Sequence, residues 1–314
     1  MIPGKSIEII PTPGNNACDQ GAGIDEYYSH FAISPDGNTM GGFLWNCDNV
    51  EGQRNFIAAA ATYNVDNGWT VLNDHLDELS SRVNALANDN VAVGWAVRPG
   101  GWWEGRVWKD GEEINMQDFA PANVTDVGEA TGVNSNGTMV VGINTWDDLW
   151  RQRGYTYNME TSEFVVLEIA EPCPWWDWFC FGEKPFNPYD ISDDGTMVGA
   201  FGTASGSGAT MVSDVLGTQK LVDFLAAQGV LNANDLGIVS NATRISNNGK
   251  HIVGWTAVDG YFGSFKLTLD QLYVCRKGKT RQVGYPGGVA DQLMHGATLG
   301  MCEADLPLQY KSNF

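Results

Sequence analysis

A short pattern of apolar and polar positions recurs along this chain. In residues 133–142, VNSNGTMVVG, an apolar residue leads into a polar turn, and a second apolar run ends in glycine. The Asn136-Gly137 pair predicts a hairpin with a type I′ turn, because both central residues of that turn need φ > 0. The same pattern begins at four further positions, Ile33, Leu86, Ile191 and Ile245.

The glycines that close these patterns are spaced by roughly 50 residues, which is the size of one propeller blade. Each repeat offers about four short strands, so we expect an all-β protein folded as a five-bladed β-propeller. A β-solenoid and a β-sandwich are the competing folds, but a solenoid coil is normally shorter than this period. The alanine run 58–61 is the one place where helix competes with strand, and residues 221–228 predict a short amphipathic helix.

Three segments follow from the repeats. Residues 1–23 form a leader, in which Ser6–Ile10 could add a strand that closes the ring against the last blade. Closure matters because an open radial array leaves an unpaired edge. Residues 24–270 hold the five repeats, and residues 271–314 form a C-terminal extension.

Composition and charge narrow the functions. The chain of 314 residues is 43% hydrophobic and carries 38 glycines, which favours short strands joined by tight turns. Its net charge of −20 argues against nucleic acid and against anionic membrane surfaces as partners. This charge is typical of a solvated acidic exterior. The alternative is that some carboxylates are gathered to hold divalent cations. No apolar run is long enough to span a membrane.

Six cysteines pair off locally along the chain, and none has the spacing of a zinc, haem or thiol-redox motif. Three disulfides would place the protein in an oxidising compartment: the periplasm, the cell surface or the medium. The first residues lack a signal peptide, so we expect a mature exported form with an added start methionine. The pairs suggested by proximity are Cys18–Cys47, Cys173–Cys180 and Cys275–Cys302.

The motif I-S-x-D-G-x-x-V-G, followed by an aromatic strand, resembles the repeats of bacterial extracellular HAF-repeat proteins. The match is closest from Leu221–Leu225 through Gly229-Val230 to Ala242–Ser246, and the resemblance covers roughly residues 25–270. The second repeat departs from the motif, having lost the serine and the turn glycine. The resemblance implies a secreted or surface β-propeller-like protein and supplies no catalytic residue.

The C-terminal extension is similar to a small module of bacterial secreted proteins. The shared features are Cys275, then Gly278-Lys279-Thr280, then a His-Gly…Leu-Gly-x-Cys run that ends at Cys302. Gly278-Lys279-Thr280 is not a phosphate-binding loop, because the leading glycine is absent. We expect a clip closed by Cys275–Cys302, whose basic residues could dock on the acidic propeller.

Tryptophan-rich inserts between the repeats are the candidate binding surface. A rigid indole face costs little conformational entropy to present and suits a sugar ring or a protein partner. The alternative is that these rings pack inward, as we expect for Trp45, Trp95, Trp108 and Trp255. The candidate ligand-binding residues are Trp102, Trp103, Trp146, Trp150, Trp175, Trp176 and Trp178.

Carboxylates beside these tryptophans supply the enzyme alternative, a polysaccharide hydrolase or lyase with paired acid and base. The candidates are Glu104, Asp147, Asp148 and Asp177. Asp36 and Asp194 in the repeat turns are candidate calcium ligands, although such turns use aspartate for backbone reasons alone. No cofactor is predicted otherwise, and the four histidines are dispersed.

We therefore expect a secreted or cell-surface propeller that binds a glycan or a surface protein without catalysis. The alternatives are the polysaccharide-active enzyme and a self-assembling subunit of an extracellular filament.

Overall fold

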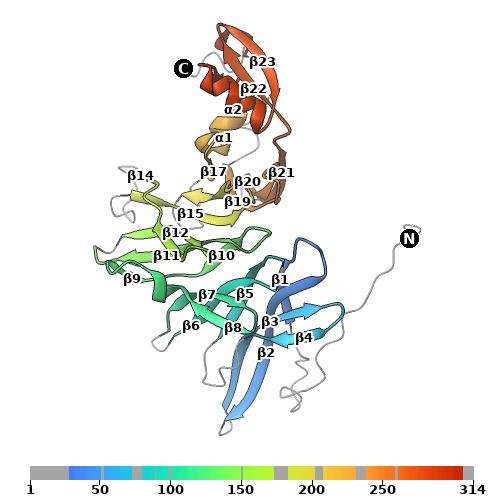
Figure 1. The fold of residues 1–314 in the computed structure, drawn as a ribbon, viewed down its shortest axis with the longest axis vertical. Coiled ribbons are helices and arrows are strands. Elements are labelled where there is room, and N and C mark those ends of the chain that lie inside the picture. The colour runs from blue at the N-terminus through green and yellow to red at the C-terminus, as the bar shows by residue number, and fades with distance from the viewer. Residues whose placement is uncertain are drawn as a thin grey trace, which may run out of the picture.

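Antiparallel sheets follow one another along the chain (Figure 1). The computed structural model describes residues 28–50, 53–72, 80–88, 90–98, 101–149, 151–172, 183–201, 208–230, 238–258 and 261–306. The first sheet contains β1 (Tyr28–Ile33), β2 (Thr39–Val50), β3 (Gln53–Asn64) and β4 (Gly68–Val71). The second contains β5 (Ser81–Leu86), β6 (Ala92–Val97), β7 (Trp103–Lys109) and β8 (Glu112–Asn115), which a 3-10 turn, η1 (Met116–Phe119), follows.

The later sheets repeat this plan with small changes. The third contains β10 (Ala130–Val133), β11 (Met139–Asp147), β12 (Gln152–Asn158) and β13 (Glu163–Val166), and β9 (Val124–Asp126) pairs with β11. The fourth contains β14 (Ala170–Pro172), β15 (Glu183–Ile191), β16 (Met197–Phe201), β17 (Ala209–Ser213) and β18 (Gly217–Lys220). The fifth contains β19 (Ile238–Ile245), β20 (His251–Val258) and β21 (Tyr261–Thr268).

Each sheet is an up-and-down meander that packs on the next one through its inner strand, which is β1, β5, β10, β15 or β19. The inner strands converge on a common axis, because Arg244 of β19 donates to the main-chain oxygen of Asn84 in β5. This arrangement is a β-propeller, as the repeat period predicted. The alanine run 58–61 lies within β3, so strand wins over helix there.

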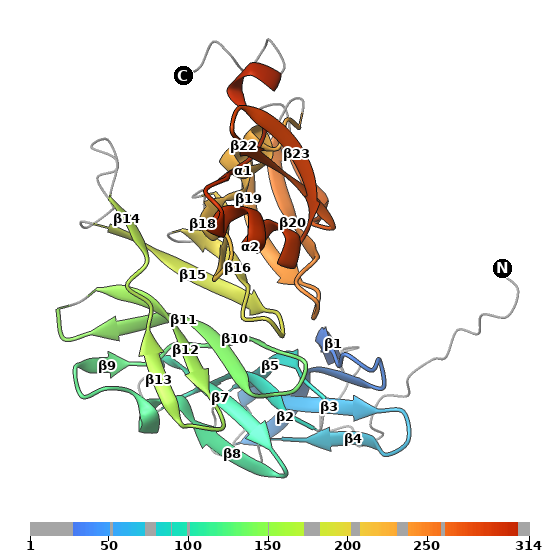
Figure 2. The ribbon, with the colours of Figure 1, turned by 45° about the horizontal axis from the view of Figure 1, so that its top comes forward.

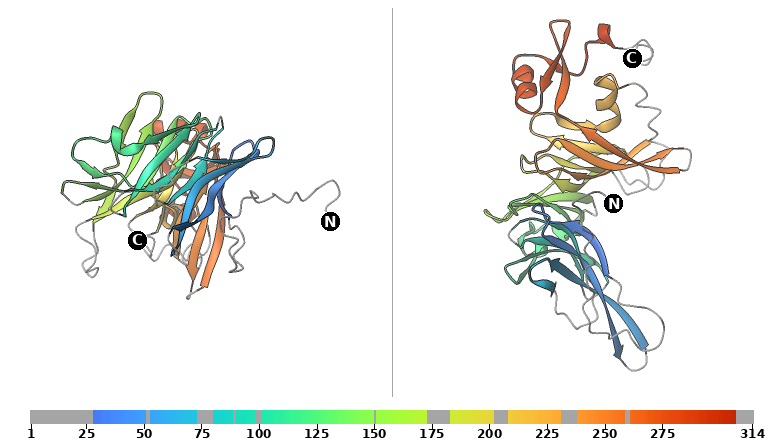
Figure 3. Two further views of the ribbon diagram at one scale, coloured as in Figure 1. Left: turned by 90° about the horizontal axis from the view of Figure 1, so that it is seen from below. Right: turned by 90° about the vertical axis from the view of Figure 1, so that its right-hand side faces the viewer.

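The five sheets form an arc that is open among the residues described. In that part of the chain, no strand of the fifth sheet packs on a strand of the first sheet in the way that consecutive sheets pack on one another. The right-hand view of Figure 3 shows the blue first sheet below the orange fifth sheet. The leader, residues 1–23, lies outside the described residues, and so does the predicted closure of the ring by its strand.

The recurring turn differs from the prediction. Of the Asn136-Gly137 pair only Gly137 has a positive φ, of 70°, so the type I′ turn is wrong. The turn is longer, because Asn134 donates its N–H to the Met139 oxygen at 3.1 Å. The Asn134 side chain fills this turn by accepting the N–H groups of Thr138 and Met139, each at 2.9 Å. A left-handed residue after a tighter turn is the usual geometry of such longer hairpins.

The closing glycines are required by a close approach of two strands. A Cβ at Gly94 would lie 1.9 Å from the Arg82 oxygen, and one at Gly199 would lie 2.0 Å from the Asn187 oxygen. Opposite each of them the inner strand has a bulge, with register shifts between Val83 and Ala85 and between Pro188 and Asp190. The repeat motif therefore encodes a bulge and the glycine that accommodates it.

The C-terminal unit contains β22 (Gln271–Arg276), β23 (Lys279–Gly284), α2 (Gly287–Met294), β24 (Thr298–Leu299) and a 3-10 turn, η2 (Glu303–Asp305). The predicted Cys275–Cys302 disulfide is present. Thr280 of the Gly-Lys-Thr run accepts the Cys302 N–H at 2.8 Å and donates to Asp305 at 2.6 Å. This threonine therefore has a structural role beside the disulfide.

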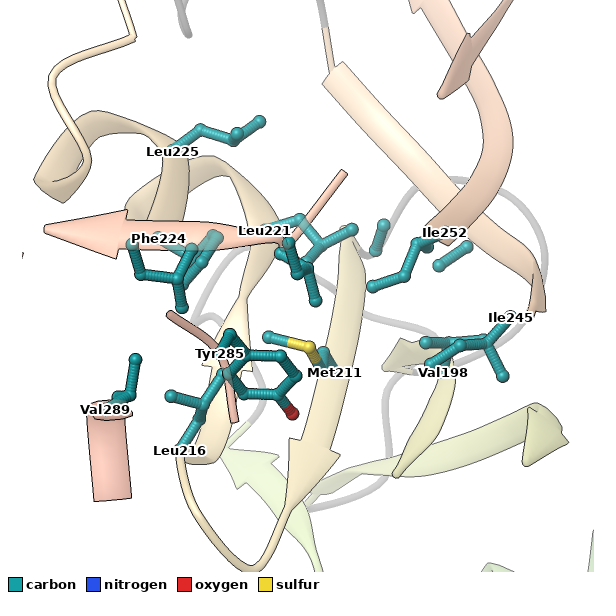
Figure 4. Packing of buried hydrophobic residues seen from close by; sticks show 14 of the residues in the cluster. Val198, Met211, Leu216, Leu221, Phe224, Leu225, Ile245, Ile252, Tyr285 and Val289 are labelled. Carbon is teal, nitrogen blue, oxygen red and sulfur yellow. The ribbon is translucent and has the colours of Figure 1, made fainter. Parts of the chain in front are cut away.

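The C-terminal unit docks through an apolar core, whereas its basic residues were expected to dock it on the acidic propeller. Figure 4 shows Tyr285 and Val289 in one buried cluster with Met211 of the fourth sheet and Phe224. Phe224 belongs to α1 (Leu221–Ala227), the predicted helix, which lies beside the C-terminal unit in Figure 2. The basic side chains of Lys277, Lys279 and Arg281 are exposed.

The closing glycine gives a first prediction. Gly199→Ala should destabilise the protein by about 3 kcal/mol, because the added methyl group overlaps the Asn187 carbonyl and forces the bulged strand away. Urea denaturation followed by circular dichroism measures the change. Gly284→Ala is the control, since a Cβ there meets nothing within 4 Å, and its effect should stay below about 1 kcal/mol. Equal losses in the two variants would contradict this account.

Candidate functional site

Two predicted tryptophans lie where β7 begins: Trp102 directly precedes the strand and Trp103 is its first residue. The Arg98 N–H donates to the Trp102 oxygen at 2.9 Å, and the Gly101 N–H donates to the Arg98 oxygen at 3.0 Å. Gly101 has a φ of 88°, which glycine adopts without steric cost. The turn leaves Trp102 63% exposed and Trp103 51% exposed, although both rings are large and apolar. We call this pair the tryptophan rim.

Trp103 is held flat on a buried ring. It stacks on Trp95 with the ring centroids 5.0 Å apart and the planes 16° from parallel. The Arg82 guanidinium lies 5.3 Å from the centre of the Trp95 ring. Strand pairing explains why Arg82, Trp95 and Trp103 lie in a row across the sheet. Arg82 pairs with Trp95, and Trp95 pairs with Gly105, which lies on the same face of β7 as Trp103, two residues earlier. Stacking and the cation–π contact thus brace the rim from the inner strand outward.

Glu104, a predicted catalytic carboxylate, is buried and bound by three side chains. It accepts from Arg106 at 2.8 Å, from Asn115 at 3.1 Å and from Arg98 at 3.4 Å. These charged and polar donors hold the buried carboxylate in one position. The arrangement positions Glu104 as an anchor for the loop.

Arg98 also joins the rim to the third sheet, because its guanidinium forms an ion pair with Asp126 of β9. Asp126 pairs with Trp146 of β11, so this ion pair links the loop before Trp102 to the strand that carries Trp146. Trp146 itself is half-buried. The remaining predicted tryptophans, Trp150, Trp175, Trp176 and Trp178, lie outside the described residues.

Asp147 is a loop anchor as well. It is buried and accepts the N–H groups of Leu149 and Arg151, and the Arg151 guanidinium at 2.7 Å. Burial raises the pKa of Asp147, but the hydrogen bonds and the charge of Arg151 outweigh it and bring the pKa below its ordinary value. Asp147 is therefore ionised at neutral pH and is no proton donor. Asp148 is exposed, and Asp177 lies outside the described residues.

The candidate calcium ligands are occupied within their own turns. Asp36 accepts from the Ser34 hydroxyl at 2.5 Å and from the Asn38 N–H at 3.1 Å, and these bonds lower its pKa. Asp194 accepts in the same way from Ser192 and Thr196. Within the described ranges, no group of three or more His, Cys, Asp or Glu side chains is placed to hold a metal ion.

The predicted cysteine pairs have separate outcomes. Cys18, Cys173 and Cys180 lie outside the described residues. Cys47 lies in β2, and its side chain lies outside the described part. Only Cys275–Cys302 falls within the described residues.

A buried polar cluster lies where the inner strands meet, and the sequence reasoning missed it. Asn84 donates to Glu129 at 3.1 Å, and Arg82 forms an ion pair with Glu129 at 3.4 Å. Burial raises the pKa of Glu129, and the positive charge of Arg82 opposes this shift. The signal available in the sequence was that Arg82 and Asn84 alternate with apolar residues in the inner strand β5.

Asp190 and Arg244 form the other side of this axial cluster. Asp190 accepts the Ile245 N–H at 2.9 Å, and Arg244 donates to the main-chain oxygens of Tyr189 and Asn84 at 3.4 and 3.0 Å. Burial raises the pKa of Asp190 to about 6, although the charge of Arg244 and the Ile245 N–H act in the opposite direction. The cluster links the second, fourth and fifth sheets.

The comparisons with known proteins add three distant likenesses. No protein-family model and no curated protein matches this chain. TolB from Acinetobacter baumannii is 12% identical with a TM-score of 0.47, covering 77% of this chain and 52% of its own length. A putative TolB from Agrobacterium tumefaciens is 12% identical with a TM-score of 0.41, covering 88% of this chain and 84% of its own.

The third is the β-propeller domain of the Trilobed protease from Pyrococcus furiosus, which is described as having an open velcro topology. It is 12% identical with a TM-score of 0.32 and covers 81% of this chain and 80% of its own. This chain spans about half the length of the first TolB. Because these three TM-scores are below 0.5, the propeller assignment rests on the strand order and packing of this chain itself.

One further finding concerns membranes. Among the described residues, no helix is both long enough and apolar enough to cross a bilayer.

Asp190 gives a prediction of pH dependence. Its pKa rises from 3.8 to about 6 on folding, so the folded state holds this proton more tightly than the unfolded state. The contribution of Asp190 to stability is therefore full below about pH 4 and is lost as the pH rises through about 6. Between pH 4 and pH 7 the wild type should lose about 2 kcal/mol relative to Asp190→Asn, which keeps an acceptor for Ile245.

Urea denaturation at each pH measures this difference. Asp148→Asn, at an exposed position, is the control and should track the wild type at every pH. If the curves for Asp190→Asn and the wild type run parallel, the axial carboxyl is not titrating as described.

Proposed function

We propose that this protein is an exported, non-catalytic binding module that holds a glycan on the tryptophan rim. The observation that carries the proposal is the stack of Trp103 on Trp95, which keeps a large apolar ring rigid and half-exposed. A ring fixed in this way loses little entropy on binding, and its free face is flat enough to cover a sugar ring.

The neighbouring carboxylates favour binding over hydrolysis. Glycoside hydrolysis needs one carboxyl that donates a proton and a second that acts as base or nucleophile. Glu104 and Asp147 are both committed to arginine side chains, and the pKa of Asp147 is lowered. The lowered pKa of Asp147 does not suit a general acid, and Glu104 is held by Arg98 and Arg106, so we place the polysaccharide-active enzyme second to binding.

A protein partner is the second candidate ligand. Leu149 is exposed on the third sheet, in the loop that Asp147 anchors, and Asp126 and Trp146 link that sheet to the rim. Aromatic and aliphatic side chains exposed together are typical of protein-binding surfaces.

Export is part of the proposal. The Cys275–Cys302 disulfide supports an oxidising compartment, because disulfides are rare in the cytosol. The resemblances to HAF-repeat proteins and to a C-terminal module of secreted bacterial proteins point to the same location, which would be the periplasm, the cell surface or the medium.

A glycan array followed by calorimetry on the retained glycans tests this function. Trp103→Ala should weaken binding by about 30-fold or more, because it removes the ring that contacts the sugar. Met294→Ala is the control, since Met294 is an exposed apolar residue of the C-terminal unit, and it should bind as the wild type does.

Three outcomes are informative. Retention of a glycan that Trp103→Ala loses supports the proposal. Retention that Trp103→Ala leaves unchanged removes the rim from the site. If no glycan is retained and a surface-protein partner is lost on the same substitution, the ligand is a protein and the glycan proposal is wrong.

A further inference from the structure

The contacts between consecutive sheets repeat the same pair of positions. The residue before the closing glycine in one sheet shares a buried cluster with the residue before the turn in the next sheet. Val93 lies in one cluster with Val133, Val141 with Ile191, and Val198 with Ile245. In the first sheet this position is Gly41, where a Cβ would lie 3.1 Å from Leu86 of the second sheet.

The corresponding pair between the fifth and first sheets does not form a contact. Its members would be Val253 in the fifth sheet and Ile33 in the first sheet, and both side chains are exposed. Val253 is 39% exposed, whereas its equivalents Val93, Val141 and Val198 are 0% exposed. The internal repeats are matched controls, because they place the same side chain at the same strand position.

Ile33 shows the same contrast from the other side. It is 62% exposed, whereas its equivalents in the later repeats are 4 to 7% exposed. Those equivalents are Leu86, Val133, Ile191 and Ile245. The fifth sheet therefore has the face that receives a following sheet, and the first sheet has the face that packs on a preceding one.

The repeat turns carry a second series of contacts along one edge of the arc. Asn88 donates its N–H to the Ser135 oxygen at 2.9 Å, and Asp193 donates its N–H to the Asn247 oxygen at 2.9 Å. Between them, Ser135 donates its N–H to the Asp193 carboxylate at 2.8 Å. The next contact in the series would join the N–H of Asn247, which is exposed, to the oxygen of Pro35.

We infer that a second copy of this chain docks here, with the fifth sheet of one copy packed on the first sheet of the next. The two faces complete a contact that the protein already makes between its own sheets, so their apolar positions and their turns are complementary. Because the faces differ, the contact is head-to-tail, and a head-to-tail contact that does not close generates a filament. Exposed terminal faces are also what repeat arrays must cover to remain soluble.

The fifth sheet is held where it faces outward. Arg244 fastens β19 to the second and fourth sheets through the Asn84 and Tyr189 oxygens. The C-terminal unit shares a core with the fourth and fifth sheets. These contacts hold the fifth sheet in its place in the arc, which favours docking between copies. This inference goes beyond glycan binding and does not depend on it.

Cysteine variants of the full chain test the arrangement. Ile33→Cys and Val253→Cys proteins, distinguished by a size tag, are oxidised separately and together and compared with the wild type on non-reducing gels. We expect neither variant to form a disulfide dimer when it is oxidised alone. The mixture should form the mixed dimer, because Ile33 of one copy meets Val253 of another. The double variant should give a ladder of larger species.

Two results would overturn the inference. A double variant that forms an internal cross-link and stays monomeric means that the arc closes on itself. Absence of any cross-link, with a mass by light scattering that stays monomeric at rising concentration, means that something else covers the faces or that they remain solvated.

Substitutions on the open face give an independent readout. The Val253→Asp protein should associate only at a concentration at least 10-fold higher than the wild type does, because the substitution places a charge in the apolar contact. Val165→Asp is the control, since Val165 is 42% exposed on the third sheet and lies on neither open face. Equal behaviour of the two variants would count against the contact.

Discussion

The close approach of an inner strand to its neighbour is the constraint on which the rest of the structure depends. A bulge brings the main-chain oxygen of the inner strand within 2.0 Å of where a Cβ would sit at Gly199 or Gly254. Only glycine accommodates that approach, and the bulge bends the strand and increases its twist. The bend lets each inner strand present side chains toward the axis as well as toward the adjacent sheet. Without it, the sheets would lack the axial contacts that hold the arc.

The convergence of the inner strands buries the polar axial cluster, which has a desolvation cost and also orders the sheets. Removing Glu129, Asp190 and their arginine partners from water is unfavourable unless each finds hydrogen bonds. Most of those bonds come from another sheet: Asn84 to Glu129, Arg244 to the Asn84 oxygen, and the Ile245 N–H to Asp190. The cluster therefore fixes how the sheets are arranged around the axis, a specificity that apolar packing between similar repeats does not provide.

In the tryptophan rim, too, charged groups support the structure and the exposed surface is aromatic. Charged groups beside the rings hold them in place: Arg82 braces Trp95 from the axis, and Glu104 and Asp126 bind Arg98 in the loop. A carboxylate beside an exposed tryptophan resembles a catalytic pair in the sequence. In the fold it is an anchor, because neighbouring arginines hold the carboxylate in place.

Local sequence determined the repeat, the strands, the α1 helix and the Cys275–Cys302 clip, because each depends on neighbours in the chain or on one short-range periodicity. Tertiary structure alone decided which residues meet between repeats. Asn84 and Arg244 met across 160 positions. Within single repeats, strand pairing and loop geometry brought Glu104 and Asp147 to nearby arginines and made them anchors. The turn type was also misjudged, since Asn134 reorganises the loop around Gly137. Val253 and Ile33 have the residue types of a buried contact, and only the arc of sheets leaves them exposed.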